Sequence, residues 1–373
     1  MTASDEDSVL LGLAGGTGRI TLNRPGALNA LTHAMVLRIS AALDAWEQDP
    51  AVDRVLITGA GERGLCAGGD IRSIHRDAAG GGTGTVGFWR DEYRLNARIA
   101  HYPKPYVALM DGIVMGGGVG VSAHGSVRIV TERSRVAMPE TGIGFVPDVG
   151  GTHLLGRAPG ELGTHLALTG TAVGAADALL CGLADHFVPA ARLADLVGDL
   201  TREPAGAPLP EVLSRYAAPS PPGVLAEARA WIDPCYAAGT VEEIVERLLD
   251  HGAPAAKEAA ETILAKSPTA LKVTLAALRR ARRLGSLERV LEQEFTVSCT
   301  ALTALPDLVE GIRAQVIDKD RSPRWSPATL PEVDEAAVAA FFTPPGKDRP
   351  RVFDRLDGLD HSDEFEEFDR PGS

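Results

Sequence analysis

The 373-residue sequence is poor in the features that mark several large classes of protein. It has only four cysteines, none of them in CxxC spacing, so neither a structural zinc site nor a disulfide framework is expected. It has no run of about 18 apolar residues, and a membrane-spanning helix is therefore not predicted. The 37 lysines and arginines are outnumbered by 50 aspartates and glutamates, and the formal net charge of -13 argues against nucleic-acid binding.

The amino-terminal stretch MTASDEDSV is acidic and lacks both a basic and an apolar segment. A secretory signal needs both, and a transit peptide is rich in arginine, so neither kind of targeting segment is expected. The four thiols are then expected to be reduced, as in a cytoplasmic protein.

The sequence also lacks the short motifs of three common catalytic or nucleotide-binding sites. No GxSxG elbow is present, which argues against a serine hydrolase of the α/β-hydrolase type. The glycine cluster around residue 117 is neither a dinucleotide fingerprint nor a P-loop, because no Lys-Ser/Thr pair follows it. No Cys/His cluster occurs either, so no metal site is predicted.

Alternating strand and helix patterns in residues 8–202 predict an α/β core built around a sheet. Residues 203–223 are rich in proline and alanine and are predicted to form a linker. Residues 224–342 are nearly all helical pattern and should form a carboxy-terminal helical region that packs on the core or on another subunit. The acidic tails at 1–7 and 343–373 are expected to be disordered. Within the core, strands are predicted at Val9–Ala14, Arg19–Asn23, Arg54–Thr58, Pro105–Met110 and Val127–Val130, and long helices at Leu31–Trp46 and Phe88–Tyr102.

Two glycine-rich turns each follow a predicted strand and open a predicted helix: Gly68–Asp70 and Met115–Gly120. Glycine lets a backbone N–H approach a ligand closely, and the first N–H groups of a helix have no partner within it. Together the two turns favour an oxyanion hole with two donors, which would stabilise a thioester-derived enolate or a tetrahedral oxyanion. The alternatives are an ordinary turn in which Asp70 caps a helix, and tight packing of a helix on the sheet.

Acidic residues near these turns are candidates for acid–base or nucleophilic chemistry. Glu140 lies in the rigid stretch MPETGIGFVPDVGG, and Asp148 comes eight residues later. Glu92 lies next to Asp91 on the predicted helix Phe88–Tyr102. The alternatives are that Glu140 merely starts a helix and that Glu92 lies on a solvated helix face.

Three long motifs follow one another in the first third of the chain: LNRP…LNAL, CAGGDI and KPYVALMDGIVMGGGVG. In this order they resemble the crotonase (enoyl-CoA hydratase/isomerase) superfamily. FWRDEYRLN, SAHGSVRIVTE, AMPETGIGFVPDVGG and RWSPATLPEV resemble its 3-hydroxyisobutyryl-CoA hydrolase subfamily. The resemblance covers residues 8–342 and implies a crotonase-like spiral of repeated β-β-α units with a carboxy-terminal helical region.

The resemblance implies a catalytic role for each of four residues. The amides of Gly69 and Gly117 match the superfamily's oxyanion hole and would bind the thioester carbonyl oxygen. Glu140 matches the subfamily's catalytic glutamate, and Asp148 matches its catalytic aspartate. Glu140 would either attack the carbonyl carbon to form a mixed anhydride or activate a water molecule, and both routes stay open.

Four more residues are implied to bind the substrate. Glu92 matches a residue that contacts the acyl group, at its 3-hydroxyl. Cys66 and Ala67 lie on the strand end that in relatives lines the path of the adenine and the pantetheine, and Asp70 belongs to the same substrate-binding group. CoA is part of the substrate, so no cofactor is implied.

Gly120 departs from the pattern of the wider superfamily. A hydratase that resembles the archetype carries a glutamate at this position and needs two carboxylates poised over one water molecule. The departure favours hydrolysis of a short 3-hydroxyacyl-CoA thioester, above all 3-hydroxyisobutyryl-CoA, in valine catabolism. The alternatives are hydratase, isomerase or other crotonase-type CoA chemistry and, from a different class, a non-catalytic scaffold or nucleic-acid-associated protein.

The predicted helix Lys272–Arg283 carries the basic run KVTLAALRRARR. It could reach the phosphates of CoA from its own or a neighbouring subunit, and the alternative is a solvated helix face. Superfamily relatives commonly form trimers or hexamers, so a homo-oligomer is an outcome that the resemblance allows.

Overall fold

The computed structural model describes residues 5–78, 80, 83–202, 208–304, 306–343 and 351–353, and eight strands in these residues form two sheets. The larger sheet has the order β1-β2-β3-β4-β6-β8, and its neighbours are parallel except for β1 and β2. The smaller sheet pairs β5 with β7 in parallel. The strands are β1 Val9–Ala14, β2 Thr17–Leu22, β3 Arg54–Gly59, β4 Tyr106–Met110, β5 Ile113–Met115, β6 Val127–Val130, β7 Arg135–Ala137 and β8 His186–Phe187.

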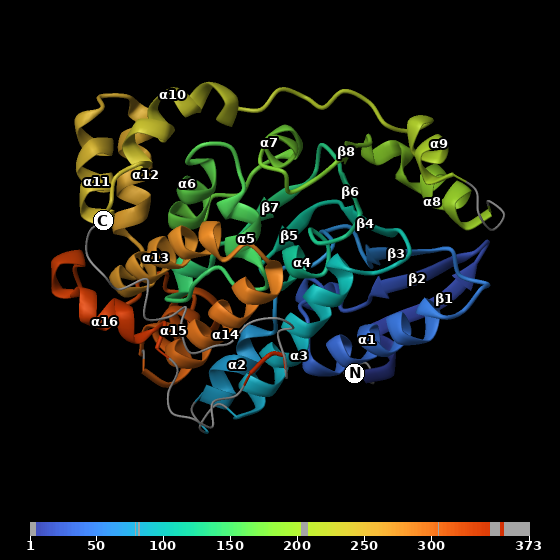
Figure 1. The fold of residues 1–373 in the computed structure, drawn as a ribbon, viewed down its shortest axis with the longest axis horizontal. Coiled ribbons are helices and arrows are strands. Elements are labelled where there is room, and N and C mark those ends of the chain that lie inside the picture. Colours follow the sequence, from blue (N-terminus) through green and yellow to red (C-terminus); the bar gives the residue numbers. More distant parts are fainter. Residues whose placement is uncertain are drawn as a thin grey trace.

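Helices cover both faces of the larger sheet and form most of the second half of the chain (Figure 1). The α-helices are α1 His33–Glu47, α2 Ile71–Ala78, α3 Thr83–Ala100, α4 Gly117–Gly120, α5 Gly151–Gly156, α6 Leu162–Thr169, α7 Ala175–Leu180, α8 Leu193–Arg202, α9 Leu209–Ser214, α10 Leu225–Tyr236, α11 Val241–Asp250, α12 Pro254–Leu264, α13 Pro268–Leu284, α14 Leu287–Ala304, α15 Pro306–Ile312 and α16 Glu335–Ala340. Short 3-10 turns are η1 Asp5–Ser8, η2 Pro25–Ala27, η3 Glu140–Ile143, η4 Ala190–Arg192 and η6 Leu330–Glu332, and η5 Arg313–Ile317 is a π-helical turn. None of the helices in these residues is long and apolar enough to cross a membrane.

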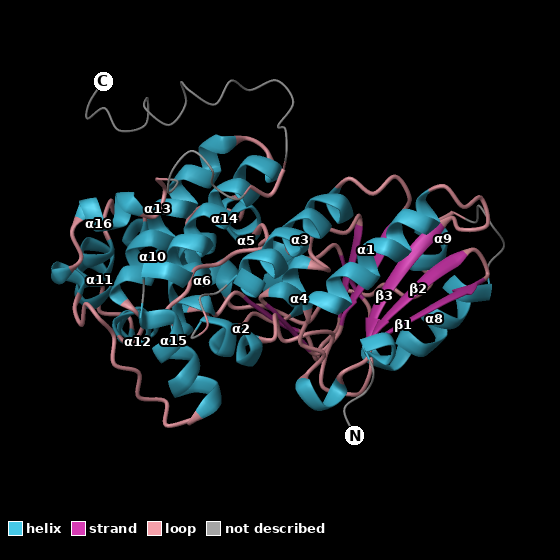
Figure 2. Cartoon of the chain, turned by 90° about the horizontal axis from the view of Figure 1, so that it is seen from below, coloured by secondary structure: helices cyan, strands magenta, loops and turns pink. Residues whose placement is uncertain are grey.

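The residues of β3 alternate between two hydrophobic clusters, as a strand buried on both faces requires. Leu56 packs with the apolar side chains of α8 and α9 on one face. Val55 and Ile57 belong to the cluster that includes α1 and α3 on the other face. Figure 2 shows α1 and α8 on opposite sides of β1, β2 and β3.

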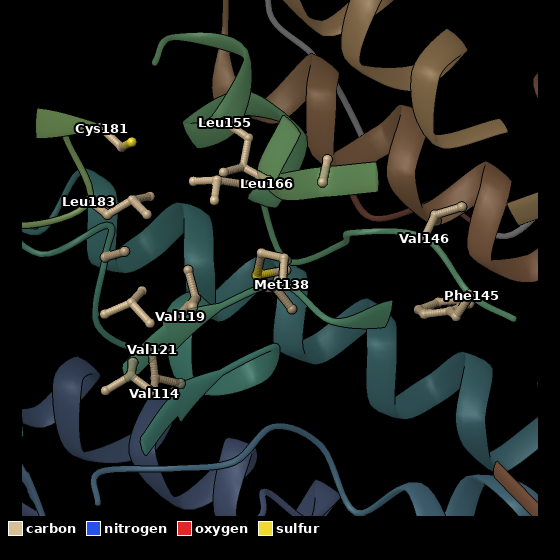
Figure 3. Close-up of a cluster of buried hydrophobic side chains, with 14 of the residues drawn as sticks. Val114, Val119, Val121, Met138, Phe145, Val146, Leu155, Leu166, Cys181 and Leu183 are labelled. Atoms are coloured by element: carbon tan, nitrogen blue, oxygen red, sulfur yellow. The ribbon is translucent and has the colours of Figure 1, made fainter. Parts of the chain in front are cut away.

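From β4 onward, consecutive strands enter the larger and the smaller sheet in turn. β4 and β6 extend the larger sheet, while β5 and β7 form the smaller one. Cys66 adds a parallel bridge to Val114 at the edge of the smaller sheet. This arrangement confirms the predicted α/β core with its repeated β-β-α units. The smaller sheet packs on a buried apolar cluster in which Val119, Met138 and Leu166 line the same small cavity, and this cluster supports the segments around residues 117 and 140 (Figure 3).

The helical region packs directly on this core, as predicted. α13 lies against α5 and α6, α14 lies against α3 and α5, and α15 lies against α2 and η3. These contacts bring side chains from residues beyond 260 to the same place as segments from the first half of the chain.

The structure corrects three of the expected boundaries. Residues 1–4, 203–207, 344–350 and 354–373 lie outside the described residues. Asp5–Ser8 is a 3-10 turn, so the ordered chain begins before residue 8. The expected linker contains α9, because its leucines and valine bury against the sheet. Val352 is fully buried and its carbonyl oxygen accepts a 2.6 Å hydrogen bond from Arg94 Nε, so the expected tail returns to the core.

Gly163 marks the place where α6 crosses α5 most closely. A Cβ on Gly163 would lie 1.7 Å from the carbonyl oxygen of Leu155, which is a backbone atom. Gly163→Ala is therefore expected to lower the free energy of unfolding by about 1–3 kcal/mol. Gly174→Ala is the matched control, since a Cβ there meets nothing within 4 Å, and its effect should stay within about 0.5 kcal/mol. Urea denaturation measures both values, and equal values would contradict this account of the packing.

Candidate active site

A cavity of about 320 Å³ lies where the loop after β3, α3, the start of α4 and the η3 segment meet. Lys266 and residues of α15 close it from the helical region. The structure brings six of the eight predicted site residues to its wall: Ala67, Gly69, Glu92, Gly117, Glu140 and Asp148.

The backbones of Gly69 and Gly117 lie side by side at one end of this cavity. The preceding residues Gly68 and Gly116 have φ values of +112° and +50°, which favour glycine. A Cβ built on Gly117 would lie 3.3 Å from the amide nitrogen of Gly69. In the described part of the chain, neither the Gly69 N–H nor the Gly117 N–H donates to a backbone carbonyl. Two amide donors are thus available to one ligand oxygen.

Glu140 opens η3 in the segment that leaves β7. Its side chain is buried, and Oε2 has no hydrogen-bond partner among the described residues. Oε1 lies beside the glycine-rich turn Met115–Gly120, since a Cβ on Gly116 would be 2.9 Å from it. Burial and, next, the negative charge of Asp148 raise the pKa of Glu140 well above 4.5.

Asp148 is buried in the segment that follows η3. Its Oδ2 accepts a 2.8 Å hydrogen bond from the hydroxyl of Tyr93. Burial raises the pKa of Asp148 to about 7, although the bond from Tyr93 lowers it. A carboxyl group that exchanges its proton near neutral pH can serve as an acid or as a base.

Glu92 lies on the buried face of α3 and is only 2% exposed. Its Oε1 has no hydrogen-bond partner in the described chain and would lie 2.6 Å from a Cβ on Gly117, so it borders the pair of glycine amides. Burial and then the charge of Asp148 raise the pKa of Glu92 well above 4.5. A protonated Glu92 can donate a hydrogen bond to an oxygen of the ligand.

The structure places Cys66 and Asp70 away from the cavity wall. Burial raises the pKa of the Cys66 thiol to about 12, so the thiol is protonated and inert. The Asp70 carboxylate pairs with Arg24 at 3.0 Å and accepts a 3.3 Å bond from the backbone N–H of Ser73 at the start of α2. Asp70 therefore caps helix α2, which is the alternative role given for it in the sequence analysis. The positions of Cys66 and Asp70 do not support contact between either side chain and the substrate.

Three cavity residues were missed by the sequence analysis. Trp89 stacks on Phe145 with ring centroids 5.2 Å apart and forms an apolar wall. Trp89 is three residues before Glu92, so the helical spacing could have placed it on the same face of α3. Lys266 comes from the helical region, its pKa is lowered by burial, and no motif in the sequence marks it.

Gly120 has no space for a longer side chain. A Cβ at this position would lie 2.8 Å from Cβ of Val149 and 2.8 Å from Nδ2 of Asn96. The place that the second carboxylate of a hydratase would need is therefore filled by these two side chains.

Three of the five basic residues of α13 pair with carboxylates within the chain. Lys272 pairs with Glu242 at 2.6 Å, and Arg279 and Arg282 pair with Glu161 at 2.8 and 2.9 Å. None of these three cations is among the residues that line the cavity in the described chain, so their positions do not support the predicted phosphate contact. No group of three or more His, Cys, Asp or Glu side chains in these residues could hold a metal ion.

Comparisons with known proteins identify the family of the chain. The family model described as Enoyl-CoA hydratase/isomerase matches residues 17–342. The chain is 44% identical over 350 residues to a 3-hydroxyisobutyryl-CoA hydrolase, mitochondrial, of Danio rerio, covering 92% of this chain and 91% of that protein. It is 44% identical over 343 residues to the protein of the same name in Homo sapiens, covering 90% and 88% of the two chains.

Two solved structures are also similar. A carnitinyl-CoA dehydratase from Mycobacterium thermoresistibile is 52% identical with a TM-score of 0.89, and the match covers 93% of this chain and 98% of that one. An enoyl-CoA hydratase from Rhodobacter sphaeroides 2.4.1 is 45% identical with a TM-score of 0.84, covering 90% and 97%. The predicted resemblance, including that to the 3-hydroxyisobutyryl-CoA hydrolases, is confirmed. The chain belongs to the enoyl-CoA hydratase/isomerase (crotonase) family.

Proposed function

We propose that this protein hydrolyses a short 3-hydroxyacyl-CoA thioester, with 3-hydroxyisobutyryl-CoA as the preferred substrate. The observation that carries the proposal is the meeting of two unpaired glycine amides with the buried carboxyl groups of Glu140 and Asp148 in one cavity. The relatives named as 3-hydroxyisobutyryl-CoA hydrolases over about nine-tenths of the chain support the choice of acyl group.

The reaction begins with the thioester carbonyl oxygen bound by the N–H groups of Gly69 and Gly117. Their hydrogen bonds strengthen as negative charge develops on that oxygen. Glu140 then either attacks the carbonyl carbon and forms a mixed anhydride, which water hydrolyses, or takes a proton from a water molecule that attacks directly. Both routes break the carbon–sulfur bond, consume one water and release the hydroxy acid and CoA.

Asp148 would assist this reaction. It can orient Glu140 or the water, or give a proton to the departing thiolate. Thiolate is a good leaving group near neutral pH, so a strong acid is not needed at this step. Glu92, protonated and beside the glycine amides, would donate a hydrogen bond to the 3-hydroxyl group of the substrate.

A thiol-release assay tests the proposal. The full chain is given 3-hydroxyisobutyryl-CoA, 3-hydroxypropionyl-CoA and isobutyryl-CoA, which lacks the hydroxyl. We expect free thiol from the two hydroxyacyl thioesters and a much lower kcat/KM for isobutyryl-CoA, because Glu92 then has no hydroxyl partner. Absence of thiol release from all three substrates would overturn the proposal.

The rate of thiol release is expected to rise with pH. Glu140 must be ionised to act as a nucleophile or a base, and burial together with the charge of Asp148 raises its pKa. The acidic limb of the profile of kcat/KM should therefore lie well above the 4.5 of an ordinary glutamate. Assays in a series of buffers from acidic to mildly alkaline pH measure the position of this limb. A limb near pH 4.5, the ordinary value for a glutamate, would contradict the burial of Glu140 beside Asp148.

A hydratase or dehydratase is the second candidate function. It is favoured by the names of the two solved relatives, a carnitinyl-CoA dehydratase and an enoyl-CoA hydratase. The closed space at Gly120 opposes it, because a second carboxylate has no place there. The decisive comparison is the amount of free thiol against the amount of enoyl thioester formed or consumed with the same acyl-CoA panel.

Three further expectations belong to this proposal. The reaction would take place in valine catabolism, in the cytoplasm, whereas the vertebrate relatives carry the word mitochondrial in their names. Imaging of the tagged full chain in its own cell tests the location. A homo-oligomer is also expected, and light scattering of the full chain measures its mass. A gel-shift with nucleic acid at moderate salt tests the alternative of a non-catalytic, nucleic-acid-associated protein.

A further inference from the structure

Helix α14 of the carboxy-terminal region approaches Asp148 in two ways: Glu294 binds the backbone that follows Asp148, and Ser298 contacts Tyr93, which binds Asp148. Glu294 and Ser298 are four residues apart on α14, so they share one face, and both are buried. No residue of α14 lines the cavity in the described chain. These side chains therefore act on the site through other groups and not on the substrate.

Glu294 holds the backbone directly after Asp148. Its carboxylate accepts hydrogen bonds from the N–H of Gly150 at 2.6 Å, from the N–H of Thr152 at 2.9 Å and from the Thr152 hydroxyl at 2.5 Å. The segment needs such support, because Val149 has a φ of +52°, which a β-branched residue rarely adopts. Without Glu294, three buried donors would lose their partner and the segment could relax.

Ser298 and Tyr93 hold the carboxyl group of Asp148 itself. The Tyr93 hydroxyl donates a 2.8 Å hydrogen bond to Oδ2 of Asp148. It also contacts the hydroxyl of Ser298 at 3.0 Å, so Ser298 is the donor in that bond because the proton of Tyr93 is already used. This chain of donors holds Oδ2 of Asp148, a residue that lines the cavity.

Building on the proposed hydrolysis, we propose that Tyr93, Ser298 and Glu294 are positioning residues that hold the carboxyl group of Asp148 at the reacting centre. The titratable groups that face Asp148 are Glu92 and Tyr93 from α3, Glu140 from η3 and Glu294 from α14. Among these groups Tyr93 donates a hydrogen bond to Asp148, and the negative charge of Asp148 raises the pKa of each of the three glutamates. The bond from Tyr93 thus favours the ionised, aligned carboxylate.

Tyr93→Phe tests this role with little change in side-chain volume. We expect kcat to fall about tenfold to a hundredfold with KM little changed, because an aligned hydrogen bond to a charged group is lost. The proton affinity of Asp148 should rise as well, so the titration of its carboxyl group should move to higher pH. Ser298→Ala should shift both quantities in the same direction by less, since Tyr93 keeps its own bond to Asp148.

Tyr102→Phe is the matched control. Tyr102 is also buried, and its hydroxyl donates a 2.9 Å hydrogen bond to the carbonyl oxygen of Leu43, outside the cavity. This variant loses a buried hydrogen bond of the same kind, so it should lower the unfolding temperature to a similar extent. Its kcat and its rate profile should equal those of the unmodified protein. Glu294→Gln, which keeps the shape of the side chain, should lower kcat because an amide cannot accept from both backbone donors.

A carbon-13 NMR titration of the aspartate side chains reads the same effect without turnover. The resonance of Asp148 is assigned by its loss in Asp148→Asn, and its titration should move to higher pH in Tyr93→Phe but not in Tyr102→Phe. An unmoved titration in Tyr93→Phe would overturn the positioning role even if the protein hydrolysed none of the thioesters. Thiol release by the unmodified protein separately decides the proposed function.

Discussion

Glu140→Gln is expected to slow the release of free thiol from 3-hydroxyisobutyryl-CoA by at least about a thousandfold. The glutamine amide has nearly the same size as the carboxyl group, so the cavity keeps its shape. It can neither attack the carbonyl carbon nor take a proton from water. Oε1 of Glu140 lies beside the turn that carries the Gly117 amide, since a Cβ on Gly116 would be 2.9 Å from it. Steady-state kinetics at saturating substrate measures the loss.

The same substitution should stabilise the fold above mildly acidic pH. The pKa of Glu140 is raised in the folded protein, so the folded state keeps its proton to higher pH than the unfolded chain does. The free energy of unfolding therefore falls as the pH rises above 4.5, and it stops falling once the folded group has ionised. Glu140→Gln removes this loss, and its unfolding midpoint in urea should exceed that of the unmodified protein at alkaline pH.

The control for Glu140→Gln is the same change at an exposed site. Glu261 lies on α12 with a side chain 63% exposed, and Glu261→Gln should leave turnover and stability unchanged. Near-normal turnover in Glu140→Gln would remove Glu140 from the mechanism altogether.

One turnover of the unmodified protein in oxygen-18 water tests whether Glu140 forms a mixed anhydride or activates a water molecule. Label in the Glu140 carboxyl group indicates an anhydride.

The first half of the chain was largely predictable because its elements are marked by local signals. β1 and β6 have the predicted bounds, since Gly15–Gly16 ends one strand and Ser126 precedes the other. The glycine turns were recognisable because a φ of +112° at Gly68 and +50° at Gly116 almost requires glycine. A pattern with such backbone demands can be read from sequence alone.

The contribution of the helical region was not predictable in the same way. Helical spacing shows that α14 has a buried face, but it does not show which residues of the core that face meets. Glu294 and Ser298 look like ordinary residues in the sequence, and only the packing of α14 against α3 and α5 brings them to Asp148. Lys266 enters the cavity wall for the same reason.

The two misplaced residues have a different cause. Cys66 and Asp70 lie within the motif CAGGDI, and the resemblance carried them to the substrate path together with Ala67. Side chains of successive residues in extended backbone point in opposite directions. Ala67 therefore faces the cavity while the thiol of Cys66 is buried behind it, and the carboxylate of Asp70 turns to Arg24.

Gly117→Ala is expected to lower kcat about a hundredfold to a thousandfold, the usual effect of losing an oxyanion-hole donor. A methyl group on Gly117 would lie 2.6 Å from Oε1 of Glu92, 3.2 Å from Cδ1 of Leu31 and 3.3 Å from the amide nitrogen of Gly69. It would therefore occupy the place where the carbonyl oxygen meets the two amides.

The backbone of Gly117 makes this substitution informative. Gly117 is the first residue of α4 and is not among the glycines with positive φ, so alanine is compatible with its conformation. The loss should consequently appear in turnover more than in folding, and the unfolding temperature should fall by less than in Gly163→Ala, whose methyl group meets backbone at 1.7 Å. KM should change less than kcat, because the amides bind the developing oxyanion more strongly than the ground-state carbonyl. Unchanged kcat in a folded Gly117→Ala protein would show that the thioester oxygen binds elsewhere in the cavity.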